Sequence, residues 1–285
     1  MSNIIVAIKN LVSDPQLELG NYYNSRHRAN AEGDSLEEYV KDLYSGTLRE
    51  TDAEERARKI RSVFSYIGND SNPPDAMLFG GDAIEVKKIE TAKGDIQLNS
   101  SHPKCKLYSL SPMITEECKK AEGGNWTEKD LLYIIGSVSQ QRLRSMFMVY
   151  GVDYAASEEK YLRIKRTIKS GVENLPGIQF AETDELGRIN KIDPLGLTSL
   201  RVRGMWILQN PWRHFSYLTS LNRKCAFEFC AIINIEKYEL HPEHIELEQM
   251  AGTEARLRIT NVKIKKPVLA SGDNRHSGSG ENRQF

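Results

Sequence analysis

The fold of this 285-residue chain is constrained most by residues 72–88, where two strand-like stretches flank a Gly-Gly-Asp turn. In the second stretch, Ile84 and Val86 alternate with Glu85 and Lys87. Because successive side chains of a strand point to opposite faces, a strand here places both apolar residues on one face and both charged residues on the other. Gly and Asp are residues that tight turns favour. The segment therefore predicts an antiparallel β-hairpin with its charges on one side.

A third charged residue, Asp75, opens the first strand of this hairpin. The hairpin brings Asp75 close to Glu85, and two carboxylates repel each other unless a cation lies between them. Hard divalent ions such as Mg²⁺ bind carboxylate oxygens and water. The pattern thus predicts a metal-dependent hydrolase site. The alternative is an exposed hairpin on which Glu85 and Lys87 form a surface ion pair that contributes little to stability.

Length and composition indicate a soluble globular protein of the cytoplasm. The hydrophobic fraction is 39% and the mean hydropathy is -0.51, and no apolar run approaches the roughly 20 residues that span a bilayer. We therefore expect no membrane segment. Residues 1–12 are apolar but lack a basic leader and a small-residue cleavage site, so they predict a first helix, not a signal peptide.

The four cysteines show no C-x-x-C spacing, which argues against a zinc ribbon and against a dense disulfide framework. They are Cys105, Cys118, Cys225 and Cys230. Reduced thiols in a cytosolic protein are the favoured interpretation. A zinc site built from His102, Cys105 and Cys118 is the less favoured alternative.

The charges balance in number, with 39 Lys and Arg against 39 Asp and Glu, but they are unevenly distributed. A stretch without acidic residues contains Lys160, Arg163, Lys165, Arg166 and Lys169. Acidic residues gather at Glu236, Glu239, Glu243, Glu246 and Glu248. A face that binds a polyanion would produce this segregation, and so would ordinary solvated faces.

Hydrophobic periodicity predicts an α/β protein with a central mixed sheet flanked by helices, built as a single domain with loop insertions over 1–268. The expected helices are 31–44, 52–66 and 158–173, and the expected strands beyond the hairpin begin at 96, 130, 143, 200, 227 and 256. In the third helix, Tyr161, Ile164 and Ile168 have the spacing of core residues. Residues 269–285 are polar and Gly-rich, which predicts a flexible tail.

The charged residues of the hairpin also match a known family pattern. Glu37 follows Gly33 on a predicted helix, Asp75 follows Pro74, and Glu85 precedes Lys87 on a predicted strand. This arrangement resembles the PD-(D/E)xK nuclease superfamily. Within it, four longer segments resemble the NgoPII-type type II restriction endonucleases, and the similarity extends over about 1–266. The segments are 69–75, 81–90, 98–104 and 201–206.

The resemblance implies specific roles. Asp75 and Glu85 are expected to bind Mg²⁺, Lys87 to position and polarise the attacking water, and Glu37 to serve as an accessory acid. It further implies a homodimer that cuts both strands of double-stranded DNA at a short palindrome, of GGCC type. A cognate DNA methyltransferase is the expected genetic partner.

Candidates for DNA binding lie in two later segments. Arg201 and Arg203 occupy alternate positions of a predicted strand and share a face, and Arg reads guanine in the major groove. The loop after the strand at 96 adds Asn99, Ser100, Ser101 and Lys104. For all of them a phosphate or plain surface role is an equal alternative, because most protein–DNA hydrogen bonds go to the backbone.

Two questions stay open at this level. Trp206, Trp212 and Tyr217 would be able to stack on bases, although core packing is the favoured interpretation for aromatic residues in such apolar segments. The activity has two alternatives: a structure-specific repair or recombination nuclease of the same superfamily, or a non-catalytic DNA-binding protein. The complete set of Asp75, Glu85 and Lys87 favours an active enzyme.

Overall fold

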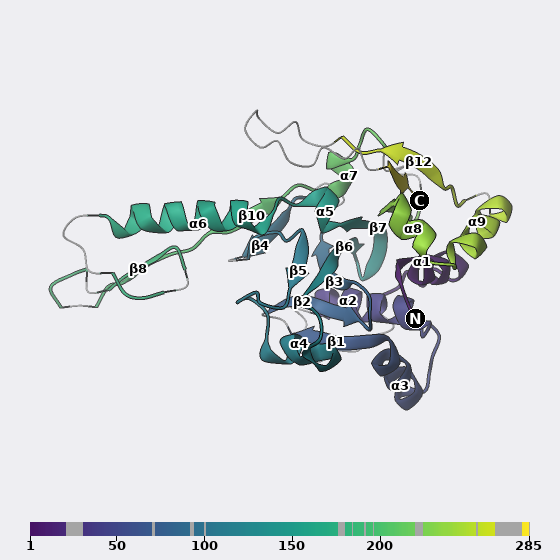
Figure 1. Ribbon diagram of the computed structural model, residues 1–285, viewed down its shortest axis with the longest axis horizontal. Helices are drawn as coiled ribbons and strands as arrows, with labels where there is room; N and C mark the ends of the chain where they lie inside the picture. Colours follow the sequence, from purple (N-terminus) through teal and green to yellow (C-terminus); the bar gives the residue numbers. More distant parts are fainter. Residues whose placement is uncertain are drawn as a thin grey trace.

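A mixed sheet forms the centre of the computed structural model, which describes residues 1–20, 31–69, 72–91, 94–99, 101–175, 180–183, 185–190, 192–195, 197–219, 225–254, 256–265 and 281–284. Eight of its nine described strands follow in the order β1-β2-β3-β6-β7-β11-β13-β12, and β5 pairs with β6 (Figure 1). The strands are β1 (Phe64–Asn69), β2 (Asn72–Leu78), β3 (Ala83–Ile89), β5 (Lys106–Tyr108), β6 (Glu128–Ser139), β7 (Arg142–Tyr150), β11 (Glu228–Asn234), β12 (Thr260–Lys263) and β13 (Glu281–Gln284).

The predicted hairpin and the mixed character of the sheet are both confirmed. Strands β2 and β3 pair antiparallel across the Gly-Gly-Asp turn. Parallel pairing joins β3 to β6 and β7 to β11, whereas β6 and β7 are antiparallel neighbours. The hairpin predicted from the sequence therefore lies beside the long, buried strand β6, inside an α/β sheet.

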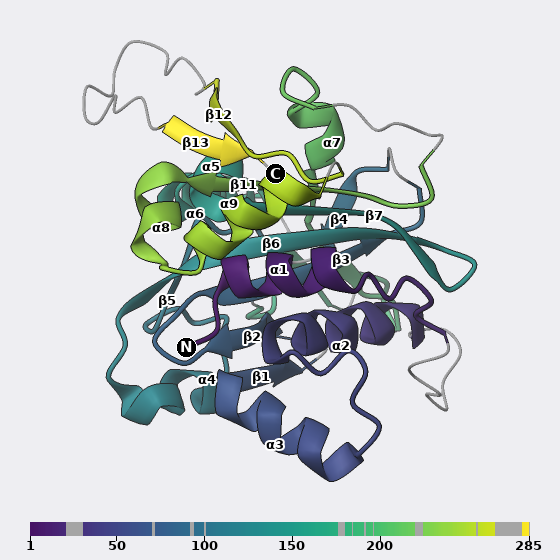
Figure 2. The same cartoon turned by 90° about the vertical axis from the view of Figure 1, so that its right-hand side faces the viewer.

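One face of the sheet is covered by helices α1 (Ile4–Ser13), α2 (Ala31–Ser45) and α9 (His244–Thr253), of which α1 and α2 lie in front of the sheet in Figure 2. The side chain of Asn3 caps α1 by accepting hydrogen bonds from its first turn. The helical stripe predicted on α2 is buried in this layer, together with Ile84 and Val86 of β3. It consists of Leu36, Tyr39, Val40 and Leu43. Burial of this stripe holds α2 against the hairpin.

The opposite face of the sheet packs against a second apolar layer. This layer includes strand β4 (Ile96–Asn99), strand β10 (Met205–Leu208) and helix α7 (Pro211–His214), and β4 and β10 pair antiparallel. Trp212 of α7 lies edge-on to Phe147 at 5.0 Å between ring centroids, which confirms core packing for this tryptophan. Because Ile84 and Val86 face α1 and α2, Glu85 and Lys87 face this second side.

Helix α6 (Glu158–Glu173) forms where it was predicted, but none of its three expected core residues is buried. It projects from the main body with strands β8 (Gly187–Ile189) and β9 (Leu200–Val202), as Figure 1 shows. No described residue of α6 is buried, and the side chains of Ile164 and Ile168 are 43% and 45% exposed. The expectation was wrong because this arm consists of one helix over a two-stranded ribbon, which is too thin to enclose a core.

The strand predicted from 200 is divided into two. β9 pairs with β8 inside the arm, whereas β10 pairs with β4 against the main body. The division falls at Arg203 and Gly204, where the chain changes pairing partner. The arm is therefore connected to the body by the segment that carries the candidate arginines.

The remaining described helices surround this framework. They are α3 (Ala53–Val63), α4 (Glu116–Lys120), the 3-10 helix η1 (Ala121–Gly124), α5 (Gly151–Tyr154) and α8 (Ile235–Leu240). Among the described residues, no helix combines the length and apolar character that a membrane crossing requires.

The chain ends in a short strand where a flexible tail was expected over 269–285. β13 lies between β11 and β12 and pairs antiparallel with both. The backbone of these four residues is paired within the sheet, and the edge strand beyond them is β12. Residues 266–280 lie outside the described part of the chain.

Candidate active site

The two strands of the hairpin separate at the acidic residues. β2 and β3 pair only at Ala76 with Ile84 and at Met77 with Ala83. Beyond this point the backbone N–H of Val86 donates to Asp75 Oδ2 at 2.6 Å. The Asp75 carboxylate thus replaces the carbonyl that a continuous ladder would supply, and this bond fixes its position between the strands.

Glu85 and Lys87 complete a cluster of three charged side chains. Lys87 Nζ lies 2.7 Å from Glu85 Oε1 and 3.7 Å from Asp75 Oδ2. The side chains are mostly buried, with 14% of Asp75, 14% of Glu85 and 25% of Lys87 exposed. The structure therefore brings together the two acids and the lysine singled out in the sequence, and it does not leave them on an exposed hairpin.

Burial dominates the electrostatics of this cluster. Burial, followed by the negative charge of Glu85, raises the pKa of Asp75 to about 8. Burial also opposes the positive charge of Lys87, but Glu85 and Asp75 outweigh it and raise the Lys87 pKa. Glu37, half-buried on α2, adds to the rise at both groups. The negative charge is therefore held in excess of what one lysine neutralises.

The donor set suits a hard divalent cation. Glu85 Oε2 is buried and has no hydrogen-bond partner, and burying a carboxylate oxygen in this way costs free energy unless a ligand completes it. Among the described residues, no group of three or more His, Cys, Asp or Glu side chains gathers around a metal position. Two carboxylates are the usual protein contribution to an Mg²⁺ site, which takes its other ligands from water and substrate phosphate.

The loop before β5, which carries candidate DNA-binding residues, lies beside this cluster, and its lysine does not have the surface position that was the alternative to DNA contact. The side chain of Lys104 is buried, with 5% exposed, and its Nζ donates to Ser101 Oγ at 2.9 Å. Its backbone N–H donates to the hydroxyl oxygen of Tyr133 at 2.8 Å, and Tyr133 is paired with Glu85 in the sheet. Ser100 lies outside the described residues. The loop is therefore anchored against β6, the strand that pairs with β3.

His102 connects this loop to the arm, a role that the sequence did not reveal. Its ring stacks on Tyr161 of α6 at 5.2 Å, and its Nε2 lies 3.6 Å from Glu158 Oε1. Burial, followed by the charge of Lys104, lowers the pKa of His102 to about 4, so the ring is neutral at neutral pH. Cys118 instead lies in the core, with its Sγ 3.8 Å from Met77 Sδ. The zinc alternative has no support among the described residues.

The candidate arginines share a face, as predicted, and also share one partner. Arg201 Nη2 lies 2.6 Å and Arg203 Nε 2.7 Å from Glu185 Oε1. Hydrogen bonding from Arg201 lowers the pKa of Glu185 to about 2. Both arginines are about half exposed, at 52% and 58%. Asn99 is exposed at the end of β4, opposite Met205 of β10, so the strand pairing brings it next to this segment.

The turn of the hairpin is anchored by residues that the sequence did not identify. Asp82 accepts hydrogen bonds from the Tyr150 hydroxyl at 2.7 Å and from Lys237 Nζ at 2.5 Å. Lys129, which is buried, donates to the carbonyls of Leu78 and Gly81 at 3.2 Å and 2.9 Å. Contacts from two strands, β6 and β7, and from helix α8 thus hold the hairpin that carries Asp75 and Glu85.

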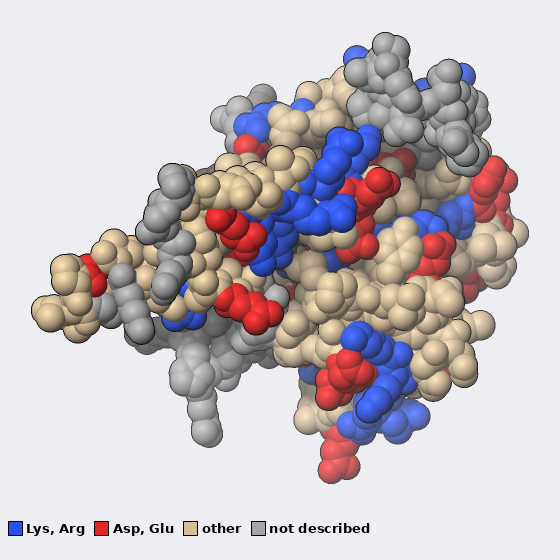
Figure 3. Space-filling model, turned by 60° about the vertical axis from the view of Figure 1, so that its left-hand side comes forward, with Lys and Arg blue, Asp and Glu red and all other residues tan. Residues whose placement is uncertain are grey.

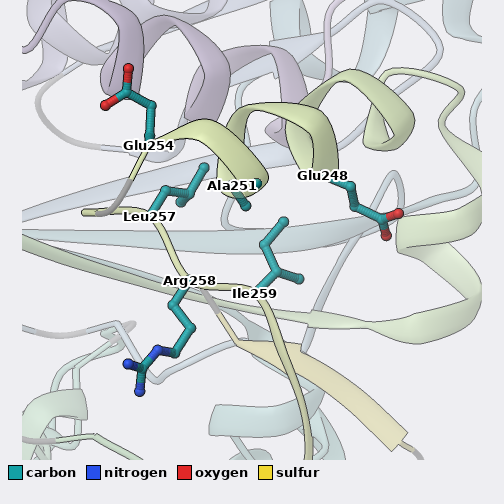
Figure 4. A pocket seen from close by; sticks show the side chains of 7 residues that line it. Glu248, Ala251, Glu254, Leu257, Arg258 and Ile259 are labelled. Carbon is teal, nitrogen blue, oxygen red and sulfur yellow. The ribbon is translucent and has the colours of Figure 1, made fainter.

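Two hollows of the surface lie away from this cluster. A pocket of about 510 Å³ is lined by residues of α9 and of the segment after it, including Glu248, Leu257 and Arg258 (Figure 4). A second, of about 1100 Å³, lies between α1, α7 and β12. Neither is lined by Asp75, Glu85 or Lys87. Lys and Arg side chains lie among acidic ones on the face of the molecule that the space-filling view shows (Figure 3).

Comparison with known proteins identifies the family of the chain. The family model of the NgoPII restriction endonuclease matches residues 2–265. The chain belongs to this family. It is also 51% identical over 266 residues to the Type II restriction enzyme NgoPII of Neisseria gonorrhoeae, a match that covers 93% of this chain and 94% of that enzyme. No solved structure matches the chain.

Membership of the NgoPII family decides between the alternatives left open by the sequence. The chain is a type II restriction endonuclease, a site-specific deoxyribonuclease, and the predicted family resemblance is confirmed. The repair nuclease and the non-catalytic DNA-binding protein are correspondingly disfavoured. The α/β architecture with a mixed central sheet is the fold expected of such an enzyme.

Proposed function

We propose that this enzyme cuts both strands of DNA at a short palindrome of GGCC type, in a reaction that depends on Mg²⁺ held by Asp75 and Glu85. The observation that carries the proposal is the convergence of these two carboxylates with Lys87, in a cluster where Glu85 Oε2 has no hydrogen-bond partner. The GGCC type rests on the family resemblance alone. A DNA methyltransferase of the same specificity is the proposed genetic partner, and the cytoplasm the proposed location.

Each residue of the cluster has a distinct proposed role. Asp75 and Glu85 hold the cation, which when bound acidifies water and neutralises charge on the phosphate. Lys87 orients the attacking water and places its ammonium where negative charge grows in the transition state. Glu37 supports the cluster from α2 as an accessory acid. The bond from the Val86 N–H keeps the Asp75 carboxylate in position before DNA arrives.

A homodimer is proposed because the described part of the chain contains one such cluster, whereas a duplex has two strands to cut. A two-fold dimer places one cluster at each strand of a palindrome. DNA contacts are proposed for Arg201, Arg203 and Asn99, which the pairing of β4 with β10 brings near one another. Ser101 and Lys104 lie closer to the catalytic strands, and Ser100 remains a candidate outside the described residues.

Digestion of a supercoiled plasmid that contains GGCC sites tests this function. With Mg²⁺ we expect discrete bands, and with EDTA we expect no cutting, because no other described group supplies the charge of the cation. A dimer with two active clusters should produce linear DNA without accumulating nicked circles. Cutting that persists in EDTA would contradict the metal role, and a smear without discrete bands would contradict sequence specificity.

The arm arginines provide a second test, of DNA recognition. If Arg203 reads a base, Arg203→Ala should weaken binding to the cognate duplex by about 1–3 kcal/mol relative to a mismatched duplex. Arg58→Ala on α3 is the matched control, since Arg58 is also an exposed arginine paired with one glutamate. Fluorescence anisotropy in Ca²⁺ measures both variants. Equal weakening on cognate and mismatched duplexes would assign Arg203 to phosphate contact instead.

A further inference from the structure

Lys104 is a buried ammonium group without a carboxylate partner. The described residues place no acid within ion-pairing distance of its Nζ, which donates only to neutral oxygens. These are the hydroxyl of Ser101 at 2.9 Å and the carbonyl of His102 at 3.4 Å. Burying a charge without a counter-ion is costly. A group retained at that cost beside an active site is a candidate for function.

The backbone around Lys104 is fixed by close contacts. Its N–H is bound to Tyr133, the sheet neighbour of Glu85. On the other side, Gly151 approaches so closely that an added Cβ would lie 2.3 Å from the Lys104 carbonyl oxygen and 2.6 Å from that of Cys105. Only glycine permits this approach of backbone to backbone. The lysine is therefore held in a defined position and is not the surface side chain that was the alternative to DNA contact.

The ammonium of Lys104 interacts electrostatically with the charged residues of the proposed catalytic cluster. Burial lowers its pKa, Lys87 acts in the same direction, and Glu85, Glu158 and Asp75 act to raise it. The two lysines differ in their distance from the carboxylates. Lys87 is directly paired with Glu85 and Asp75, whereas Lys104 is attracted to these acids from beyond ion-pairing distance. Once a cation engages Asp75 and Glu85, Glu158 is the remaining described acid that acts on Lys104, from beyond ion-pairing distance, and an incoming phosphate would be the first anion to contact its ammonium directly.

We propose that Lys104 is a second catalytic cation, whose ammonium donates to a non-bridging oxygen of the scissile phosphate. The proposal rests on the function proposed above and moves Lys104 from sequence recognition to phosphate activation. A phosphodiester brings one negative charge and gains more in the transition state, where a preorganised donor in a buried site is most effective. The anchored backbone and the missing counter-ion are the features that this role requires.

Replacement of Lys104 by Met tests the role, because Met fills a similar volume without charge. We expect Lys104→Met to slow single-turnover cleavage of a GGCC duplex by about 100–1,000-fold, the loss typical of removing one such donor. Its affinity for the same duplex, measured with Ca²⁺ and also without divalent ions, should fall by no more than about threefold, because many other phosphate contacts remain. Lys106→Met is the matched control, since Lys106 lies two residues away and pairs with Glu128 at 2.6 Å.

Stability measurements separate catalysis from a structural role. Exchanging a buried, unpaired ammonium for an apolar side chain should leave the melting temperature unchanged or higher. Lys104→Gln, which keeps a donor for Ser101, should lose cleavage in the same way. Failure of both variants to fold would make Lys104 structural and overturn the proposal. Equal losses of affinity and rate would overturn it as well, because they would indicate simple DNA binding.

The control also separates this inference from the function on which it rests. If wild-type enzyme and Lys106→Met both fail to cut DNA with GGCC sites, the proposed function fails. If both cut and Lys104→Met cuts at the same rate, only the role of Lys104 is wrong.

Discussion

Replacement of Asp75 by Asn is expected to reduce cleavage by on the order of 1,000-fold or more, because it removes a charged ligand of the catalytic cation. Asn has nearly the same shape, and its amide oxygen still accepts the bond that the Val86 N–H donates at 2.6 Å. Single-turnover cleavage in Mg²⁺ measures the effect. The control is Asp14→Asn, which removes an acid paired with Arg49 away from the cluster and should cut normally.

The Asp75→Asn substitution is also expected to change how the stability of the enzyme depends on pH. Burial and Glu85 raise the pKa of Asp75 from an ordinary 3.8 to about 8 in the folded protein. The unfolded chain therefore releases this proton at lower pH, and the carboxyl costs stability as pH rises between about 4 and 8. In EDTA, the melting temperature of Asp75→Asn minus that of wild type should increase from pH 5 to pH 8. A difference that is constant or falls would show that folding does not raise the pKa of Asp75.

Replacement of Lys87 by Met is the second large effect, with an expected loss of about 100–1,000-fold in the single-turnover rate. The reason is the loss of the ammonium that orients water and stabilises charge on the phosphate. DNA binding in Ca²⁺ should remain, since most phosphate contacts lie elsewhere. Lys119→Met on α4 is the control, because it removes an exposed lysine that pairs with Glu116. Cleavage by Lys87→Met at the control rate would remove Lys87 from the mechanism.

At pH 8, where Asp75→Asn is expected to relieve the cost of the buried Asp75 carboxylate, Lys87→Met is expected to act in the opposite direction and destabilise the enzyme. Lys87 is the near cation for both carboxylates, at 2.7 Å and 3.7 Å. Without it, two buried acids face each other unneutralised, so the melting temperature in EDTA should fall below that of wild type. Added Ca²⁺ should restore part of the loss. This pair of opposite shifts is specific to two acids and one lysine that share one buried site.

The local part of this site was predictable from sequence because it depends on short-range rules. The alternation of Ile84 and Val86 with Glu85 and Lys87 fixes which side chains share a face, and the turn between the strands fixes that Asp75 returns beside Glu85. The helical stripe of α2 was predictable for the same reason. In each case the pattern lies within one element or one hairpin.

The rest of the site depends on pairing between distant segments, which periodicity does not encode. Tyr133 becomes a neighbour of Glu85 through the parallel pairing of β3 and β6, across an intervening stretch that includes β4 and β5. Lys104 was predicted to contact DNA or to lie on the surface, as a residue of the polar loop after the strand at 96. Its burial follows from the Tyr133 and Gly151 contacts, and neither is visible in the order of residues.

In the arm, too, the sequence predicted the helix but not the burial of its side chains. Tyr161, Ile164 and Ile168 have the spacing of a core helix, but spacing alone does not say whether enough structure exists to cover it. Here the covering layer is the narrow ribbon of β8 and β9, so the isoleucines remain partly exposed. A periodic pattern predicts an amphipathic helix correctly and its depth of burial only when the neighbouring layers are known.

Asp75 and Glu85 are predicted to hold one divalent ion together in the presence of DNA. Titration of Mn²⁺ into the complex of enzyme with a GGCC duplex, followed by the paramagnetic resonance of free Mn²⁺, measures this binding directly. Wild-type complex is predicted to bind the ion, and the Asp75→Asn complex to bind it at least about 100-fold more weakly, because an anionic oxygen ligand is lost. Equal Mn²⁺ affinity in the two complexes would show that Asp75 does not bind the ion.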